Sequence, residues 1–268
     1  MNYDIWFDYT RLEETCGDIQ RTRDVYERAI TNMPPFNDKK YWRRYIFLWI
    51  NYAIFEELTA KNIDRASEVY KKVLDIIPHK SFTFSKIWIL YSHFFIRNKD
   101  IEQARKVFGK SIGLCPREKV FKAYVELELQ LGNIDRCRKI YEKFIECQPE
   151  NTNAWVKYAE LERSLDERER CRAIFDIAIN QNLDMPEIVW KAYINVEMSF
   201  EEYDKVRQLY ARLLEKTRHL KVWLSYAKFE QEVYNIDGAR GVFENAYRFF
   251  KEANFKDENN EINFKEVI

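Results

Sequence analysis

Residues 155–175 contain the pattern that decides the fold, and they read WVKYAELERSLDERERCRAIF. Trp155 is followed by Tyr158 three residues later, by Glu162 seven residues later and by Arg172 seventeen residues later. Variants of this spacing occur seven times along the chain, at intervals of 33 to 43 residues. Self-similarity at such a period indicates a repeat architecture in which each copy forms one supersecondary unit. The leading aromatic residues of the copies are Trp6, Trp49, Trp88, Phe121, Trp155, Trp190 and Trp223.

The other framework positions of the repeat are nearly complete. The tyrosines are Tyr9, Tyr52, Tyr91, Tyr124, Tyr158, Tyr193 and Tyr226. The acids are Glu13, Glu56, Glu128, Glu162, Glu197 and Glu230, and Phe95 is the exception. The arginines are Arg23, Arg105, Arg138, Arg172, Arg207 and Arg240. The second repeat has one extra residue, which places Ser67 at the arginine position and leaves Arg65 nearby. A branched aliphatic residue and an aromatic residue close each copy, as in Val25-Tyr26.

Each copy is predicted to be a helix, a turn and a second helix. The chain of 268 residues has only six Gly and six Pro, and every Pro falls between one copy and the next. Residues such as Asp18 and Asn62 stand between the two halves, where they would cap the second helix. We therefore expect an all-α solenoid over residues 1–253, with repeats starting near 4, 40, 86, 119, 153, 188 and 221. Residues 254–268 are expected to form a polar tail or the start of a further repeat.

The acid and the arginine of one copy are predicted to pair. Positions 0, 3 and 7 of a helix lie within about 60° of one another, so Glu162 shares the inward face with Trp155 and Tyr158. In an antiparallel hairpin, Glu162 and Arg172 are equally far from the turn and should lie side by side. The planar guanidinium suits this role because it can bind a carboxylate through two hydrogen bonds while it stays charged.

The repeat resembles the half-a-tetratricopeptide (HAT) repeat, whose signature W-x-x-Y-x-x-x-E followed by R-x-(V/I/L)-(Y/F) covers residues 6 to 250. Segments outside that signature, which include YWRRYIFLWINY at 41–52 and HKSFTF at 79–84, are similar to the crooked-neck family of pre-mRNA splicing factors. The resemblance implies a nuclear, non-catalytic scaffold of the spliceosome, associated with the nineteen complex, that binds other splicing proteins. Family members are longer, so we interpret the chain as a fragment. A HAT scaffold of another RNA-processing complex and a direct RNA-binding solenoid are the alternatives.

Composition and motifs favour no enzyme, cofactor, metal site or small-molecule substrate. The charge is balanced, with 44 Lys plus Arg against 44 Asp plus Glu, unlike a strongly basic nucleic-acid-binding domain. No apolar run reaches the roughly 20 residues of a membrane span. The five Cys include no C-x-x-C pair, which favours a reducing compartment. Residues 109–111 read GKS but lie in a predicted helix, and His79, His93 and His219 belong to different repeats.

Two basic clusters are candidate binding surfaces. The first is Lys39, Lys40, Arg43 and Arg44, which precede Trp49 on a helix predicted to be two turns longer than the others. A protruding basic helix could contact RNA phosphates or an acidic partner, and the alternative is an ordinary solvated face. The second cluster is Arg212, Lys216, Arg218 and Lys221, with the same two interpretations.

Overall fold

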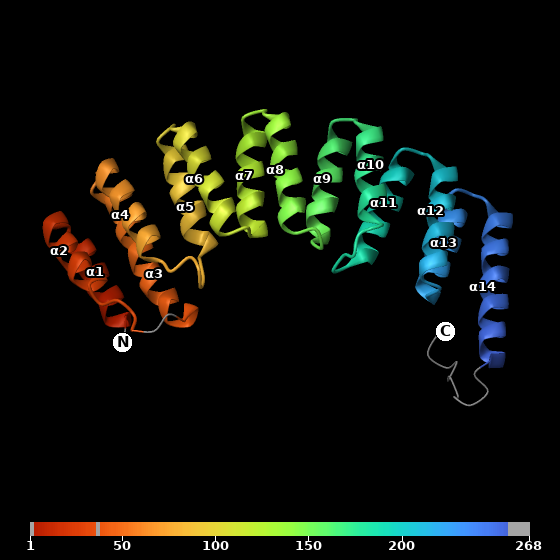
Figure 1. Ribbon diagram of the computed structural model, residues 1–268, viewed down its shortest axis with the longest axis horizontal. Coiled ribbons are helices and arrows are strands. Elements are labelled where there is room, and N and C mark those ends of the chain that lie inside the picture. Colours follow the sequence, from red (N-terminus) through yellow and green to blue (C-terminus); the bar gives the residue numbers. More distant parts are fainter. Residues whose placement is uncertain (1–2, 36–37, 257–268) are drawn as a thin grey trace. The chain divides into compact units, whose positions relative to one another are not determined.

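The computed structural model describes residues 3–35 and 38–256, and the regular structure within these ranges is entirely helical (Figure 1). The chain divides into two compact units, Met1–Gln148 and Pro149–Ile268. The first unit contains α1 (Asp4–Cys16), α2 (Ile19–Ile30), α3 (Lys39–Ile54), the π-helical segment η1 (Phe55–Thr59), α4 (Ile63–Ile76), α5 (Ser85–Arg97), α6 (Ile101–Leu114), α7 (Glu118–Gln130) and α8 (Ile134–Cys147). The second unit contains α9 (Thr152–Ser164), α10 (Arg168–Ala178), α11 (Pro186–Ser199), α12 (Tyr203–Lys216), α13 (Leu220–Glu232) and α14 (Ile236–Lys256).

Each unit is an α-solenoid of stacked hairpins. The odd-numbered helix of each pair packs on the even-numbered helix that follows it, as α5 does on α6 and α13 on α14. The even-numbered helix then packs on the first helix of the next hairpin, as α6 does on α7 and α12 on α13. The all-α prediction is therefore confirmed. Helix α14 continues through residues 254–256 of the expected tail, and residues 257–268 lie outside the described part of the chain.

Side-chain caps set the starts of several second helices. Asp18 accepts a hydrogen bond from the backbone N–H of Arg21 at 3.0 Å, and Asn62 accepts one from the N–H of Arg65 at 3.1 Å. The N–H groups of the first helical turn have no partner within the helix, so these bonds stabilise each start. Before the first of these caps, Gly17 turns the chain with a φ of +81°, which glycine tolerates without a steric penalty.

The aromatic framework forms most of the core. Trp49, Trp88, Trp155 and Trp190 are buried, whereas Trp6 and Trp223 are half-buried. Small residues that share one repeat position on the second helices, Ala104, Cys137, Cys171 and Ala239, are buried as well. All five cysteines are free thiols. Burial of the thiols raises the pKa of Cys137 and raises that of Cys171 to about 11, which suits packing residues rather than nucleophiles.

The second repeat accommodates its extra residue in η1. One residue inserted into an α-helix widens a turn to π geometry. Here the widened segment is the last part of the helix, which ends at Thr59. Helix α3 has 16 residues and runs directly into the five residues of η1, whereas α5 has 13. The predicted extra length is confirmed. A further consequence is that two consecutive carboxylates, Glu56 and Glu57, are both buried.

Candidate protein-interaction surface

The framework ion pairs join successive repeats, so the predicted pairing within one hairpin is wrong. At each of four junctions the arginine of one repeat binds the glutamate of the next through both Nε and Nη2. The pairs, with these two distances, are Arg23–Glu56 (2.7 and 2.8 Å), Arg105–Glu128 (2.7 and 3.0 Å), Arg172–Glu197 (2.8 and 2.9 Å) and Arg207–Glu230 (2.8 and 3.1 Å). These glutamates are buried, and their arginines keep only a minor exposed fraction.

The error has a simple geometric cause. Spacing from the turn fixes how high a side chain lies along its helix, so the framework arginine and glutamate lie at matching levels in each repeat that has both. It does not determine which neighbouring helix the side chain faces. The second helix contacts the first helix of its own hairpin and also that of the next one, and the arginine lies at the latter contact.

Forked hydrogen bonds keep both partners charged. Burial alone would raise the pKa of Glu128, but the hydrogen bonds from Arg105 and from the Asn133 side chain, the latter at 2.9 Å, hold that pKa below its ordinary value. The bond to Glu128 correspondingly raises the pKa of Arg105. Asn235 donates to Glu230 at 2.8 Å in the same way. Both oxygens of these two carboxylates therefore accept hydrogen bonds from structural donors.

Aromatic stacking accompanies these ion pairs. The ring that closes one repeat stacks on the framework tyrosine of the next at centroid distances of 4.7 to 5.1 Å and interplanar angles up to 22°. The pairs are Tyr26–Tyr52, Tyr70–Tyr91, Phe108–Tyr124, Phe175–Tyr193 and Tyr210–Tyr226. Each junction in this set therefore combines stacked rings with polar contacts between the same two helices.

The remaining framework residues lie at the ends of the units. Glu13 is buried and binds Arg21 at 3.1 Å, and Tyr9 lies beside Arg28. Arg138 on α8 binds Asp135 at 3.3 Å. On α9, Glu162 is buried, Tyr158 is half-buried, and the indole N–H of Trp155 donates to the carbonyl of Pro149 at 2.9 Å. Arg240 on α14 binds Asp237 at 3.2 Å and is mostly exposed.

The first basic cluster is partly engaged in contacts within the chain. Arg44 forms an ion pair with Asp4, and the Nζ atom of Lys39 lies 5.5 Å from the ring centroid of Phe84. Lys40 and Arg43 are exposed and have no ion-pair partner in the described part of the chain. Within the described ranges the cluster therefore has two cations without an ion-pair partner on one helix, which is a smaller footprint than the sequence indicates.

Most of the second basic cluster is also engaged. Arg212 pairs with Asp176 at 3.1 Å, Lys216 donates to the carbonyl of Ile179 at 2.6 Å, and the guanidinium of Arg218 lies 4.8 Å from the ring centroid of Phe249. Lys221 is exposed without an ion-pair partner among the described residues. It faces a groove that the repeat pattern does not predict.

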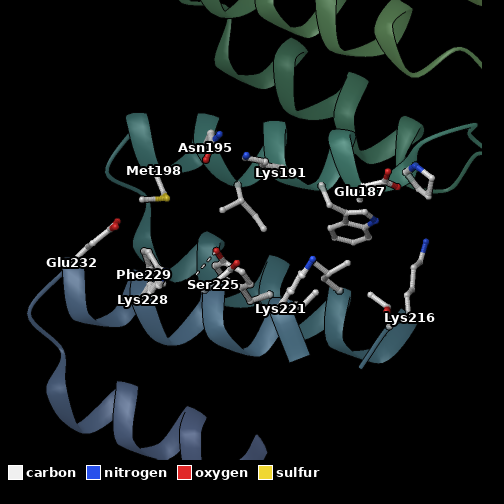
Figure 2. Close-up of a pocket in the computed structure, with 17 residues that line it drawn as sticks. Glu187, Lys191, Asn195, Met198, Lys216, Lys221, Ser225, Lys228, Phe229 and Glu232 are labelled. Atoms are coloured by element: carbon white, nitrogen blue, oxygen red, sulfur yellow. Dashed lines mark hydrogen bonds between the residues drawn. The ribbon is translucent and has the colours of Figure 1, made fainter. Parts of the chain in front are cut away.

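This groove lies between α11 and α13 in the second unit and encloses about 720 Å³ (Figure 2). Its apolar surface includes Trp190 and Ile194 from α11 and Phe229 from α13. Lys191, Lys221 and Lys228 line it as well, with Glu187 and Glu232 toward opposite ends (Figure 2). Sequence reasoning misses Lys191 and Lys228 because both occupy positions that the repeat leaves free to vary.

The GKS tripeptide and two of the histidines lie in ordinary structural positions. Residues 109–111 lie inside α6. His79 bonds Thr83 at 3.1 Å and the carbonyl of Leu74 at 2.7 Å, and His219 caps α13. In residues 3–35 and 38–256, no group of three or more His, Cys, Asp or Glu has a metal-binding arrangement. None of the helices described there combines the length and apolar character needed to cross a bilayer.

Comparison with known proteins identifies the family of this framework. Residues 1–150 match the model described as "Pre-mRNA-splicing factor Syf1/CNRKL1 N-terminal HAT repeat", and residues 118–249 match "PRP39 N-terminal HAT repeat". The chain is 53% identical to "Pre-mRNA-splicing factor clf1" of Aspergillus fumigatus over 97% of its length, and 52% identical to "Crooked neck-like protein 1" of Homo sapiens over 94%. The chain belongs to the crooked-neck family of HAT-repeat pre-mRNA splicing factors.

Crooked-neck relatives are considerably longer than this chain. It spans 42% of the Aspergillus protein, 30% of the human protein and 33% of the Dictyostelium discoideum "Crooked neck-like protein 1", to which it is 53% identical over 87% of its own length. Among solved structures, a tetratricopeptide repeat protein of Parabacteroides merdae aligns over 92% of both chains at 15% identity with a TM-score of 0.38. That score is too low to support an inference.

Proposed function

We propose that this chain is a non-catalytic, nuclear protein-interaction scaffold of the spliceosome, associated with the nineteen complex and acting in pre-mRNA splicing. The proposal rests on the contacts that the framework residues make. At the junctions described above, the recurring Arg, Glu and Tyr side chains form contacts between successive repeats. Crooked-neck relatives are named as pre-mRNA splicing factors, which supports the same assignment.

The proposed mechanism is display of variable side chains on a rigid framework. Forked ion pairs and stacked rings fix the angle between neighbouring hairpins, because both contacts tolerate only a narrow range of geometries. Positions outside the framework, such as Lys40 and Lys191, are then held at defined places on the surface. Solenoids use such extended surfaces to bind partners without large rearrangement.

Direct RNA contact is the second candidate, because Lys40 and Arg43 are exposed without ion-pair partners among the described residues. Their neighbours Lys39 and Arg44 already contact Phe84 and Asp4. Two free cations give a weak phosphate footprint, since affinity for nucleic acid rises with the number of phosphates neutralised. Reversing all four charges and measuring RNA affinity against salt tests this candidate. An unchanged affinity and salt slope would exclude it.

Affinity capture from nuclear extract tests the scaffold proposal. The chain is used as bait with and without ribonuclease, and the captured proteins are identified by mass spectrometry. We expect nineteen-complex proteins to remain after ribonuclease treatment, because docking on a protein surface needs no RNA bridge. Capture of a different RNA-processing complex, or capture only while RNA is intact, would contradict the proposal.

A further inference from the structure

We infer that the groove between α11 and α13 binds an acidic amphipathic helix of a partner protein. This inference rests on the proposed scaffold function and assigns one docking site to it. Within the second unit, the first helices α9 and α11 pack directly on each other, whereas a cavity of about 720 Å³ opens between α11 and α13. At that place an apolar surface has no covering element within the described part of the unit.

The shape of the groove fits a helix. Its α11 wall extends from Pro186 to Met198, a rise of about 18 Å at 1.5 Å per residue, which matches a partner helix of about three turns. Pro186, Leu213 and Val222 line the groove without being fully buried, and they offer apolar area to a stripe of anchors spaced at i, i+3, i+4 and i+7. Trp190, Ile194 and Phe229 form the buried floor beneath them. Met198 is also part of the lining, and its unbranched side chain can adapt to the shape of an anchor.

The charges around the groove indicate an acidic partner. Lys191 projects from α11, and Lys221 and Lys228 project from α13 (Figure 2). All three are exposed, and none has an ion-pair partner among the residues that the structure describes. Carboxylates on the flanks of an apolar stripe would pair with lysines from both walls, which would hold the helix in one orientation.

The same surface is poorly suited to RNA. Trp190 and Phe229 are only 4% and 2% exposed, so their ring faces are not available as stacking platforms for bases. Glu187 and Glu232 lie toward the two ends of the groove and would repel a phosphate backbone that ran along it (Figure 2). An apolar groove with a few lysines favours a protein side-chain stripe over a polyanion.

Fluorescence anisotropy with a synthetic peptide tests the inference on the full chain. The probe is a labelled peptide of about twelve residues, with Leu and Phe at helical stripe positions and Glu on the flanks. We expect saturable binding that weakens by about tenfold or more in the variant K191E/K221E/K228E. A peptide with Lys in place of Glu should then prefer that variant, and this exchange of preference cannot arise from misfolding.

The matched control is K106E/K110E/K139E, which changes the net charge equally at three exposed lysines of the first unit. It should bind the acidic peptide within about twofold of the unaltered chain. Equal weakening in the control, or equal binding of a scrambled peptide without the stripe, would overturn the inference.

Two other occupants are tested in the same assay. Displacement of the peptide by a uridine-rich RNA of about twelve nucleotides would overturn the inference. A tenfold gain on deleting residues 257–268 would identify the chain's own tail as the occupant and overturn it too.

Nuclear-extract capture separates this inference from the proposed function. If K191E/K221E/K228E captures the same splicing proteins in the same amounts as the unaltered chain, the groove assignment fails and the scaffold proposal stands. If the unaltered chain captures none of them, the scaffold proposal itself fails. Loss of a subset of proteins in the groove variant alone, together with the peptide result, supports both.

Discussion

The junction between α6 and α7 and the junction between α4 and α5 join neighbouring repeats through different residues. The first uses the framework pair Arg105–Glu128. In the second, the corresponding positions are Ser67 and Phe95, and the Ser67 hydroxyl lies 3.3 Å from the Tyr91 hydroxyl. A forked ion pair nonetheless joins the same two repeats, because Arg97 at the end of α5 binds Glu57 of η1 at 2.5 and 2.7 Å.

The comparison shows that a forked Arg–Glu ion pair links neighbouring repeats in both places, although different sequence positions supply it. Glu57 becomes available because η1 places it next to Glu56 inside the structure. Glu56 binds backward to Arg23, and Glu57 binds forward to Arg97. The π-helical segment therefore supplies a second buried carboxylate, which links η1 to α5 across the repeat boundary where the framework pair is missing.

The largest expected loss of stability is at the α6–α7 junction, which has the framework pair. Glu128→Ala removes the acceptor of the Nε and Nη2 atoms of Arg105 and of the amide of Asn133. Loss of one partner of a buried ion pair costs about 3 to 5 kcal/mol, so urea unfolding should show a decrease of that size in the free energy of unfolding. The control is Glu126→Ala, at an exposed position two residues away, which should change stability by less than about 0.5 kcal/mol. Equal effects would contradict the framework role of Glu128.

A smaller loss of stability is expected when the Arg97–Glu57 pair is broken. The Arg97 side chain is 45% exposed and that of Arg105 is 16% exposed, so water screens the Arg97–Glu57 pair more strongly. We expect Arg97→Ala to cost about 1 to 2 kcal/mol and Arg105→Ala about 3 kcal/mol in urea unfolding. Arg97→Lys keeps the charge without the fork and should fall between Arg97→Ala and the unaltered chain. A larger loss for Arg97→Ala than for Arg105→Ala would reverse the proposed ranking.

The sequence predicts the hairpins well because aromatic spacing and turn residues act within one repeat. It does not predict the partner of each arginine, since spacing along the chain fixes a level and leaves the neighbouring helix open. One signal was available: Ser67 and Phe95 depart from the pattern together, as the two members of one pair between successive repeats would. The groove carries no such signal, because Lys191 and Lys228 occupy variable positions.

A double-mutant cycle at the α4–α5 junction tests the pairing between repeats directly. Ser67→Arg and Phe95→Glu place the framework pair at positions that lack it. Phe95→Glu alone should destabilise the chain, because Phe95 is half-buried against Tyr91 and Phe94. The double variant should recover about 1 kcal/mol through coupling of the new charges. Zero coupling would mean that these two positions do not face each other.

The smallest expected effect is the change in the stabilising contribution of Glu128 at acidic pH. The pKa of Glu128 is held below its ordinary value of 4.5, so its ion pair contributes stability above that value and loses the contribution as pH falls through the lowered pKa. The difference in unfolding free energy between the unaltered chain and Glu128→Gln should therefore be constant near neutral pH and shrink below about pH 4. Other carboxylates titrate alike in both proteins and cancel in this difference. A difference that stays constant or grows in acid would mean that the charge of Glu128 does not stabilise the junction.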